Sequence, residues 1–130
     1  MILMPSMIPA QLTINKPLVL TKAVVNTANY LDLPKVKLAH VLGVSAATVS
    51  RLYSGRYQLS PTKKEWDFAV LLVRLFRSLD SIVGGAADDA RKWLNSDNKA
   101  FAGEKPLELI ESTEGIVRVV TYLDACRAVI

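Results

Sequence analysis

The 130-residue sequence predicts an all-α fold. In several segments apolar residues recur every three to four positions, as on one face of a helix, and the alternation typical of strands is rare. Glycines and prolines stand between these segments, where helices end and begin. Apolar residues make up 51% of the chain, which is high for a small monomer, so we expect a second copy or a partner to cover part of the surface.

The helical pattern divides the chain at a pair of glycines. We expect helices over residues 18–31, 35–42, 45–53, 61–81, 87–95, 106–111 and 114–128. Ser60 and Pro61 are a strong start signal for the longest helix, as N-cap and first helical residue, and Thr113 can cap the last one. Gly84 and Gly85 end the longest helix. They predict an N-terminal arm at 1–17, a first domain at 18–83 and a second domain at 84–130.

The most informative segment is KVKLAHVLGVSAATVSRLY, residues 35–53, which indicates two short helices joined by a turn. Gly43 occupies the turn, where a residue tolerant of positive φ is favoured, and Ser45 suits the N-cap of the second helix. Ala39 is small enough for the two helices to cross closely. This is the helix-turn-helix pattern, whose second helix enters the major groove of DNA, although a plain αα-hairpin can have the same pattern.

The charges of the two halves differ. Residues 1–64 carry eight Lys or Arg and a single acid, whereas residues 65–130 carry eight basic and eleven acidic residues. Binding to phosphate requires Lys and Arg, which here dominate the half that contains the helix-turn-helix pattern. An ordinary solvated surface can show the same asymmetry, but the two signals together favour DNA binding.

The DNA contacts are expected at the start of the second motif helix, because this end of a recognition helix reaches the base edges. We assign base contacts to Ser45, Ala47, Thr48 and Arg51. Arg51 can bind guanine with its forked guanidinium or hold a phosphate, and Lys37 and Arg56 are better placed for phosphate. Alternatively, Thr48 is an ordinary surface residue and Arg51 belongs to a salt bridge.

Residue types that carry catalysis or bind metal are scarce. His40 and Cys126 are the only histidine and cysteine of the sequence, so it offers no zinc cluster, no Cys–His nucleophile and no intrachain disulfide. We find no Ser/His/Asp set and no phosphate-binding loop, and an enzyme is therefore disfavoured. The lone cysteine fits a reducing cytoplasm, and the absence of Lys or Arg before Lys16 argues against a secretory signal.

The second half, DARKWLNSDNKAFAGEKPLELIESTEGIVRVVTYL, resembles the C-terminal domain of the Xre/MbcA/ParS antitoxins. The matched positions are, in order, Trp93, Leu94, Asn98, Ala100, Gly103, Pro106, Leu109, Thr113 and Gly115. A Xre-like helix-turn-helix usually precedes this domain in the family. The sequence departs from the family pattern at Ala102, where a glycine is usual, at Asp97, where proline is common, and in lacking a glycine-containing tail.

The resemblance implies an N-terminal Xre/Cro-like helix-turn-helix domain, a small C-terminal helical toxin-binding domain, and an antitoxin function. Such a protein neutralises an NAD-consuming toxin, most typically one with a RES domain, by covering its NAD site, and represses its own operon through operator DNA. The candidate toxin contacts are Arg118, Tyr122, Arg127 and Ile130. We expect a cytoplasmic homodimer without cofactor, metal or membrane partner. The alternatives are a Xre/Cro-type repressor without a toxin and a solitary antitoxin that has lost its partner.

Overall fold

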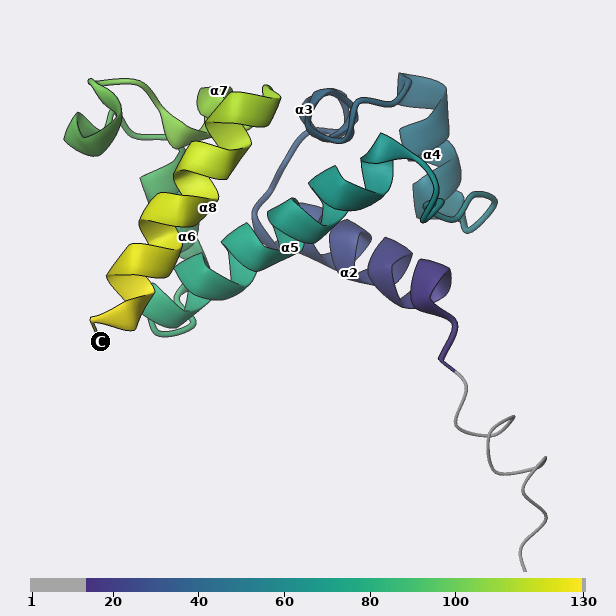
Figure 1. Ribbon diagram of the computed structural model, residues 1–130, viewed down its shortest axis with the longest axis horizontal. Coiled ribbons are helices and arrows are strands. Elements are labelled where there is room, and N and C mark those ends of the chain that lie inside the picture. Colours follow the sequence, from purple (N-terminus) through teal and green to yellow (C-terminus); the bar gives the residue numbers. More distant parts are fainter. Residues whose placement is uncertain (1–13, 130) are drawn as a thin grey trace, which may run out of the picture.

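The computed structural model describes residues 14–129, and this part of the chain is helical without a strand, which confirms the all-α prediction (Figure 1). The helices are α2 (Lys16–Tyr30), α3 (Lys35–Leu42), α4 (Ala46–Ser54), α5 (Lys64–Ile82), α6 (Ala87–Leu94), the 3₁₀ turn η1 (Lys99–Phe101), α7 (Pro106–Leu109) and α8 (Thr113–Ala128). Most of the expected N-terminal arm lies outside the described residues, and its last two residues, Lys16 and Pro17, already belong to α2.

Helix α5 is the centre of the fold. It packs against α2, α3 and α8, and its contacts with α8 are the most extensive (Figure 1). Its residues Leu72, Leu75 and Leu79 are almost fully buried, and burial of each such side chain contributes about 2 kcal/mol. One continuous cluster of buried side chains extends from α2 and α3 through α5 to α8. The division of the chain at residues 84–85 stays a prediction.

The turn between α3 and α4 has the predicted geometry. Gly43 ends α3 with a φ of 71°, in the left-handed region that favours glycine. Ser45 is the N-cap of α4, and its side-chain oxygen accepts a hydrogen bond from the Thr48 amide at 3.1 Å. Val49 and Leu52 of α4 are buried in the core, as are Leu38 and Leu42 of α3. These contacts fix α4 across α3 and leave its opposite face in solvent.

Two predicted N-caps are wrong. Helix α5 begins at Lys64, three residues after Pro61, because the buried carboxylate of Glu65 accepts hydrogen bonds from the Ser60 amide at 2.9 Å and the Tyr57 hydroxyl at 2.7 Å. This pairing holds Ser60 in a turn. Helix α8 is capped by Ser112 rather than by Thr113, since the Ser112 hydroxyl oxygen accepts the hydrogen bond from the Gly115 amide at 3.0 Å.

The 3₁₀ turn η1 ends in a conformation that suits glycine better than the residue present. Ala102 has a φ of 56°, whereas the neighbouring Gly103 has a φ of 84°. An alanine in this region costs about 1–2 kcal/mol of conformational strain. Replacing it with glycine removes the strain, but the greater freedom of glycine in the unfolded chain offsets part of this gain. We therefore expect Ala102→Gly to raise the free energy of unfolding by about 0.5–1 kcal/mol in urea denaturation. Ala100→Gly, inside η1, is the control and should lower stability; a loss in both variants would contradict the prediction.

Candidate functional site

The exposed face of α4 carries most of the predicted DNA contacts. The side chains of Ser45, Ala47 and Arg51 are exposed and Thr48 is half-buried. The Thr48 hydroxyl lies 3.0 Å from the Ser45 hydroxyl and accepts a hydrogen bond from the Arg51 guanidinium at 3.2 Å. Within residues 14–129 no carboxylate lies at ion-pair distance from Arg51, so the salt-bridge alternative finds no support there. The structure thus brings Ser45, Thr48 and Arg51 into one connected row, with Arg56 exposed beyond the end of α4.

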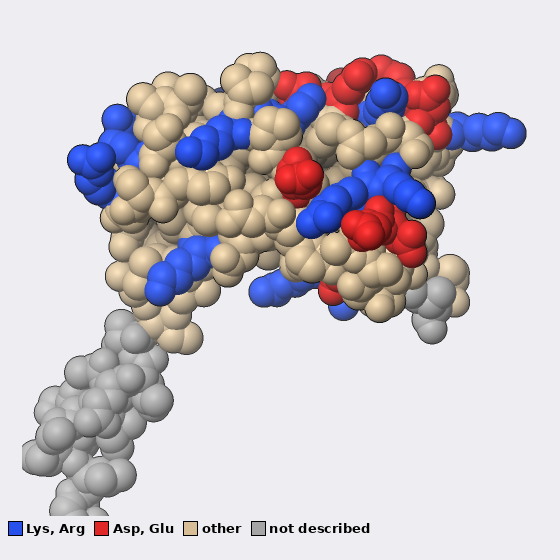
Figure 2. All heavy atoms as spheres, turned by 180° about the vertical axis from the view of Figure 1, so that it is seen from behind, with Lys and Arg blue, Asp and Glu red and all other residues tan. Residues whose placement is uncertain are grey.

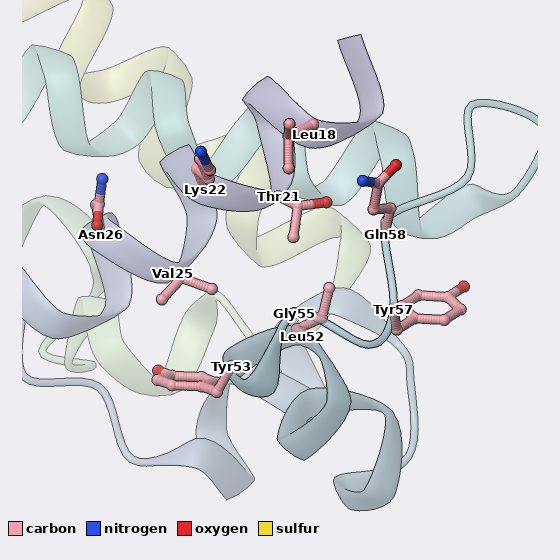
Figure 3. A pocket seen from close by; sticks show the side chains of 10 residues that line it. All are labelled: Leu18, Thr21, Lys22, Val25, Asn26, Leu52, Tyr53, Gly55, Tyr57 and Gln58. Atoms are coloured by element: carbon pink, nitrogen blue, oxygen red, sulfur yellow. The ribbon is translucent and has the colours of Figure 1, made fainter. Parts of the chain in front are cut away.

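The C-terminal end of α4 lies beside α2. A pocket of about 370 Å³ lies between α2 and the end of α4 (Figure 3). Leu18 and Val25 of α2 line it, together with Tyr53 of α4. The Lys35 ammonium stands 4.9 Å from the centre of the Tyr53 ring. At the other end of α4, the end that would enter a DNA groove, Ser45, Ala46 and Ala47 are exposed.

Lys37 differs from the other candidate DNA contacts because it is already paired. Its ammonium lies 2.6 Å from Glu111 in the α7–α8 corner, and only 18% of its side chain is exposed. His40 of α3 lies 2.5 Å from the other oxygen of the same carboxylate. Lys37 can reach a phosphate only by leaving Glu111, so the structure gives less support to its predicted role than to that of Arg51 or Arg56.

The contacts from Lys37 and then His40 hold the pKa of Glu111 below its ordinary value. A depressed carboxyl pKa stabilises the fold above the ordinary pKa, and this contribution is lost as the pH falls through the lower folded value. We expect Glu111→Gln to be less stable than the native protein at pH 7 and the gap to shrink below about pH 4. Denaturation at several pH values measures this gap. The exposed Glu108 supplies the control, Glu108→Gln, and a gap independent of pH would contradict the prediction.

A second candidate surface lies on the outward side of α8, which we call the α8 outer face (Val117, Arg118, Thr121 and Tyr122). It borders a shallow pocket of about 340 Å³ that also includes Ala100 and Phe101. The Tyr122 ring is stacked on Trp93 at 6.3 Å and meets the Phe101 ring edge-on at 5.2 Å. The Arg118 guanidinium stands 5.7 Å from the centre of the Phe101 ring. Two predicted toxin contacts, Arg118 and Tyr122, thus lie together.

The other two predicted toxin contacts are placed differently. Arg127 is exposed on the last turn of α8, and Ile130 lies outside the described residues. Sequence reasoning missed Val117, which is 45% exposed although its neighbour Ile116 is buried. A signal existed, because an apolar residue at an outward position of an amphipathic helix suggests a contact surface.

The surface charges follow the asymmetry of the sequence. On the face that Figure 2 shows, basic side chains are spread over both halves, whereas acidic side chains gather over the half away from the start of α2. Among residues 14–129 no group of His, Cys, Asp and Glu side chains is arranged to hold a metal ion. None of the helices in the same range is long and apolar enough to span a membrane.

One solved structure and one curated protein show the extent of the similarity. A chain of the crystal structure of the M. tuberculosis MbcT–MbcA toxin–antitoxin complex superposes with a TM-score of 0.64, at 23% identity, over 86% of this chain and 96% of that chain. This likeness shows the fold. The 6-hydroxy-3-succinoylpyridine 3-monooxygenase HspA of Pseudomonas putida (strain DSM 28022 / S16) is 33% identical over 82 residues, or 62% of this chain. The match spans a quarter of that protein's length.

Two family models match the chain one after the other. The Antitoxin Xre-like helix-turn-helix domain matches residues 12–74, which include α3 and α4. The Antitoxin Xre/MbcA/ParS C-terminal toxin-binding domain matches residues 78–128, which include η1 and the α8 outer face. Since the two matches together account for nearly all of the helical structure, the chain belongs to the Xre/MbcA/ParS family of antitoxins.

Proposed function

We propose that this protein is the antitoxin of a type II toxin–antitoxin pair, that it neutralises a NAD-consuming RES-type toxin by covering the NAD site, and that it represses its own operon. The proposal places the protein in the cytoplasm as a homodimer without catalytic activity. The observation that carries it is the α8 outer face, an exposed aromatic and aliphatic surface within the segment that matches a toxin-binding domain.

The α8 outer face supports a toxin contact by its chemistry. Val117 is 45% exposed and Tyr122 is 37% exposed, and large apolar side chains that stay in solvent on a helix favour burial against a partner. The rings of Trp93 and Phe101 hold Tyr122 in one orientation, so little side-chain entropy is lost on binding. Arg118 and Arg127 are assigned to carboxylates on the toxin. A cleft that binds NAD needs positive groups of its own for the phosphates, and those groups would repel an arginine.

The repressor half of the proposal rests on α4. Its connected side chains Ser45, Thr48 and Arg51, with Ala47, are assigned to base edges, and Arg56 is assigned to a phosphate. A dimer that contacts about four to eight phosphates should lose affinity with salt at a slope of log K against log salt of roughly −4 to −7. A shallower slope would contradict binding through the phosphate backbone.

Separable point variants test both halves of the proposal. Val117→Glu inserts a charge into the α8 outer face, so cells that also express the RES-type toxin should lose NAD although the purified variant still shifts operator DNA. Asn29→Glu adds the same charge at an exposed position of α2, remote in sequence from both candidate surfaces, and should protect cells normally. The assignment fails if Val117→Glu still protects while changes in α4 abolish protection. Operator binding without any toxin binding would favour a Xre/Cro-type repressor.

A further inference from the structure

Three side chains form a row of hydrogen bonds along the exposed face of α4. The Arg51 Nη2 atom donates to the Thr48 hydroxyl oxygen at 3.2 Å, and the Thr48 and Ser45 hydroxyls lie 3.0 Å apart. The Ser45 oxygen, at the N-cap, also accepts a hydrogen bond from the Thr48 amide at 3.1 Å. Residues three apart along a helix are neighbours on its surface. The row therefore links the Arg51 side chain to the cap of its own helix.

The row turns the Arg51 side chain toward the N-terminal end of α4. Thr48 precedes Arg51 by three residues, which is about 4.5 Å along the helix axis. The guanidinium is thus held toward the end of a recognition helix that reaches base edges. An exposed arginine without a partner samples many rotamers and loses this freedom on binding. A guanidinium that is already held binds at a lower entropic cost.

The hydrogen bond to Thr48 leaves Arg51 able to read a base. A guanidinium has five N–H donors, and Nη2 belongs to two forks, one shared with Nε and one shared with Nη1. Thr48 takes one of the two Nη2 hydrogens, so the fork that uses the other hydrogen stays free. A free fork matches N7 and O6 of guanine. Within the described residues no carboxylate at ion-pair distance competes for Arg51.

We infer that Thr48 is a positioning residue, whose hydroxyl holds the Arg51 guanidinium in the orientation that reads a guanine of the operator. The inference rests on the proposed operator binding and assigns part of its specificity to this pair. The methyl group of Thr48, the other branch of the side chain, is the part assigned to a base edge of its own. Recognition of the guanine then depends on two residues, although Arg51 alone touches it.

Thr48→Val tests this role, because valine keeps the branched shape of threonine and removes the hydroxyl. Its affinity for a duplex of the promoter of its own gene should fall about 3- to 10-fold per site in fluorescence anisotropy. Its affinity for an unrelated duplex of equal length, and the salt slope, should stay unchanged, because no charge is lost. Thr48→Ser restores the hydroxyl and should regain most of the preference for the promoter.

Ser54→Ala is the matched control on the same helix. The Ser54 hydroxyl donates to the backbone oxygen of Arg51 at 3.2 Å and has no recorded bond to the guanidinium. Its removal should therefore leave the affinity for the promoter duplex unchanged. A fall equal to that of Thr48→Val would show that any lost hydroxyl on α4 weakens binding, and would overturn the inference.

A double-mutant cycle separates positioning from direct reading. In an Arg51→Ala background, Thr48→Val should cost no further affinity, because the guanidinium that Thr48 positions is absent. An equal loss with and without Arg51 would overturn the inference, since the Thr48 hydroxyl would then contact DNA itself. If Thr48→Val does not fold by circular dichroism, Thr48→Ala takes its place, because alanine favours helices.

Failure of the inference differs from failure of the proposed function. A native chain without preference for its promoter duplex refutes operator binding, and the inference falls with it. A native chain that prefers the duplex, together with a Thr48→Val variant that binds it equally well, refutes the inference alone.

Discussion

Gly115→Ala should open the corner between α7 and α8 and lower the free energy of unfolding by about 3 kcal/mol or more. A Cβ atom on Gly115 would lie 1.9 Å from the carbonyl oxygen of Leu109 and 2.8 Å from the hydroxyl of Ser112. The first of these atoms belongs to the backbone, so no side-chain rotation can relieve the contact, and α7 and α8 must move apart. Urea denaturation measures the loss.

Gly84→Ala separates this steric effect from the ordinary cost of replacing glycine. Gly84 has a φ of 63°, but no atom lies within 4 Å of the place that a methyl group on it would take, so only backbone strain of about 1 kcal/mol is expected. Equal losses in the two variants would show that the α7–α8 corner adapts to a methyl group. Because α8 carries the outer face, Gly115→Ala should also weaken protection against the toxin.

Arg51→Ala should lower operator affinity by about 1–3 kcal/mol per site, or roughly 5- to 150-fold. Fold stability should change by less than about 0.5 kcal/mol, because Arg51 is exposed and its side chain donates a hydrogen bond only to Thr48 within the described chain. Fluorescence anisotropy with labelled operator at several salt concentrations measures the affinity, and toxin binding should be unchanged.

Arg51→Lys is the matched control for this prediction. It keeps the charge but loses the fork that binds guanine, so it should retain the salt dependence and lose discrimination between operator and unrelated DNA. Unchanged affinity in Arg51→Ala would remove Arg51 from the DNA interface. Unfolding of the same variant would show that the residue is structural.

The helices that sequence predicted best are those with local signals at both ends. Gly43 and Ser45 set the turn between α3 and α4, and each acts through atoms within a few residues. The predicted start of α5 was wrong because the buried carboxylate of Glu65 must be hydrogen-bonded. The Ser60 amide donates one of these hydrogen bonds, so Ser60 stays in the preceding turn and does not cap α5. The burial of Glu65 depends on tertiary packing, which a local pattern does not contain.

The candidate sites show the same limit. Arg51 and Arg118 could be named from their places on predicted helices. The pairing of Lys37 with Glu111 joins residues 74 positions apart, and no periodicity in either helix indicates it. The stacking of Trp93 on Tyr122 likewise depends on how α6 and α8 meet. Sequence therefore predicted which residues are available on each helix, but not which of them the fold has already paired.

Helix α5 has a consequence for how the proposed antitoxin would behave as a regulatory switch. The two family matches meet between residues 74 and 78, inside this helix, so the DNA-binding and toxin-binding segments share one structural support. Damage to α5, by a protease or by a destabilising substitution, would remove both activities in a single event. Under the proposed function, the loss that frees the toxin would also free the promoter, and new antitoxin synthesis would begin in the cell that needs it.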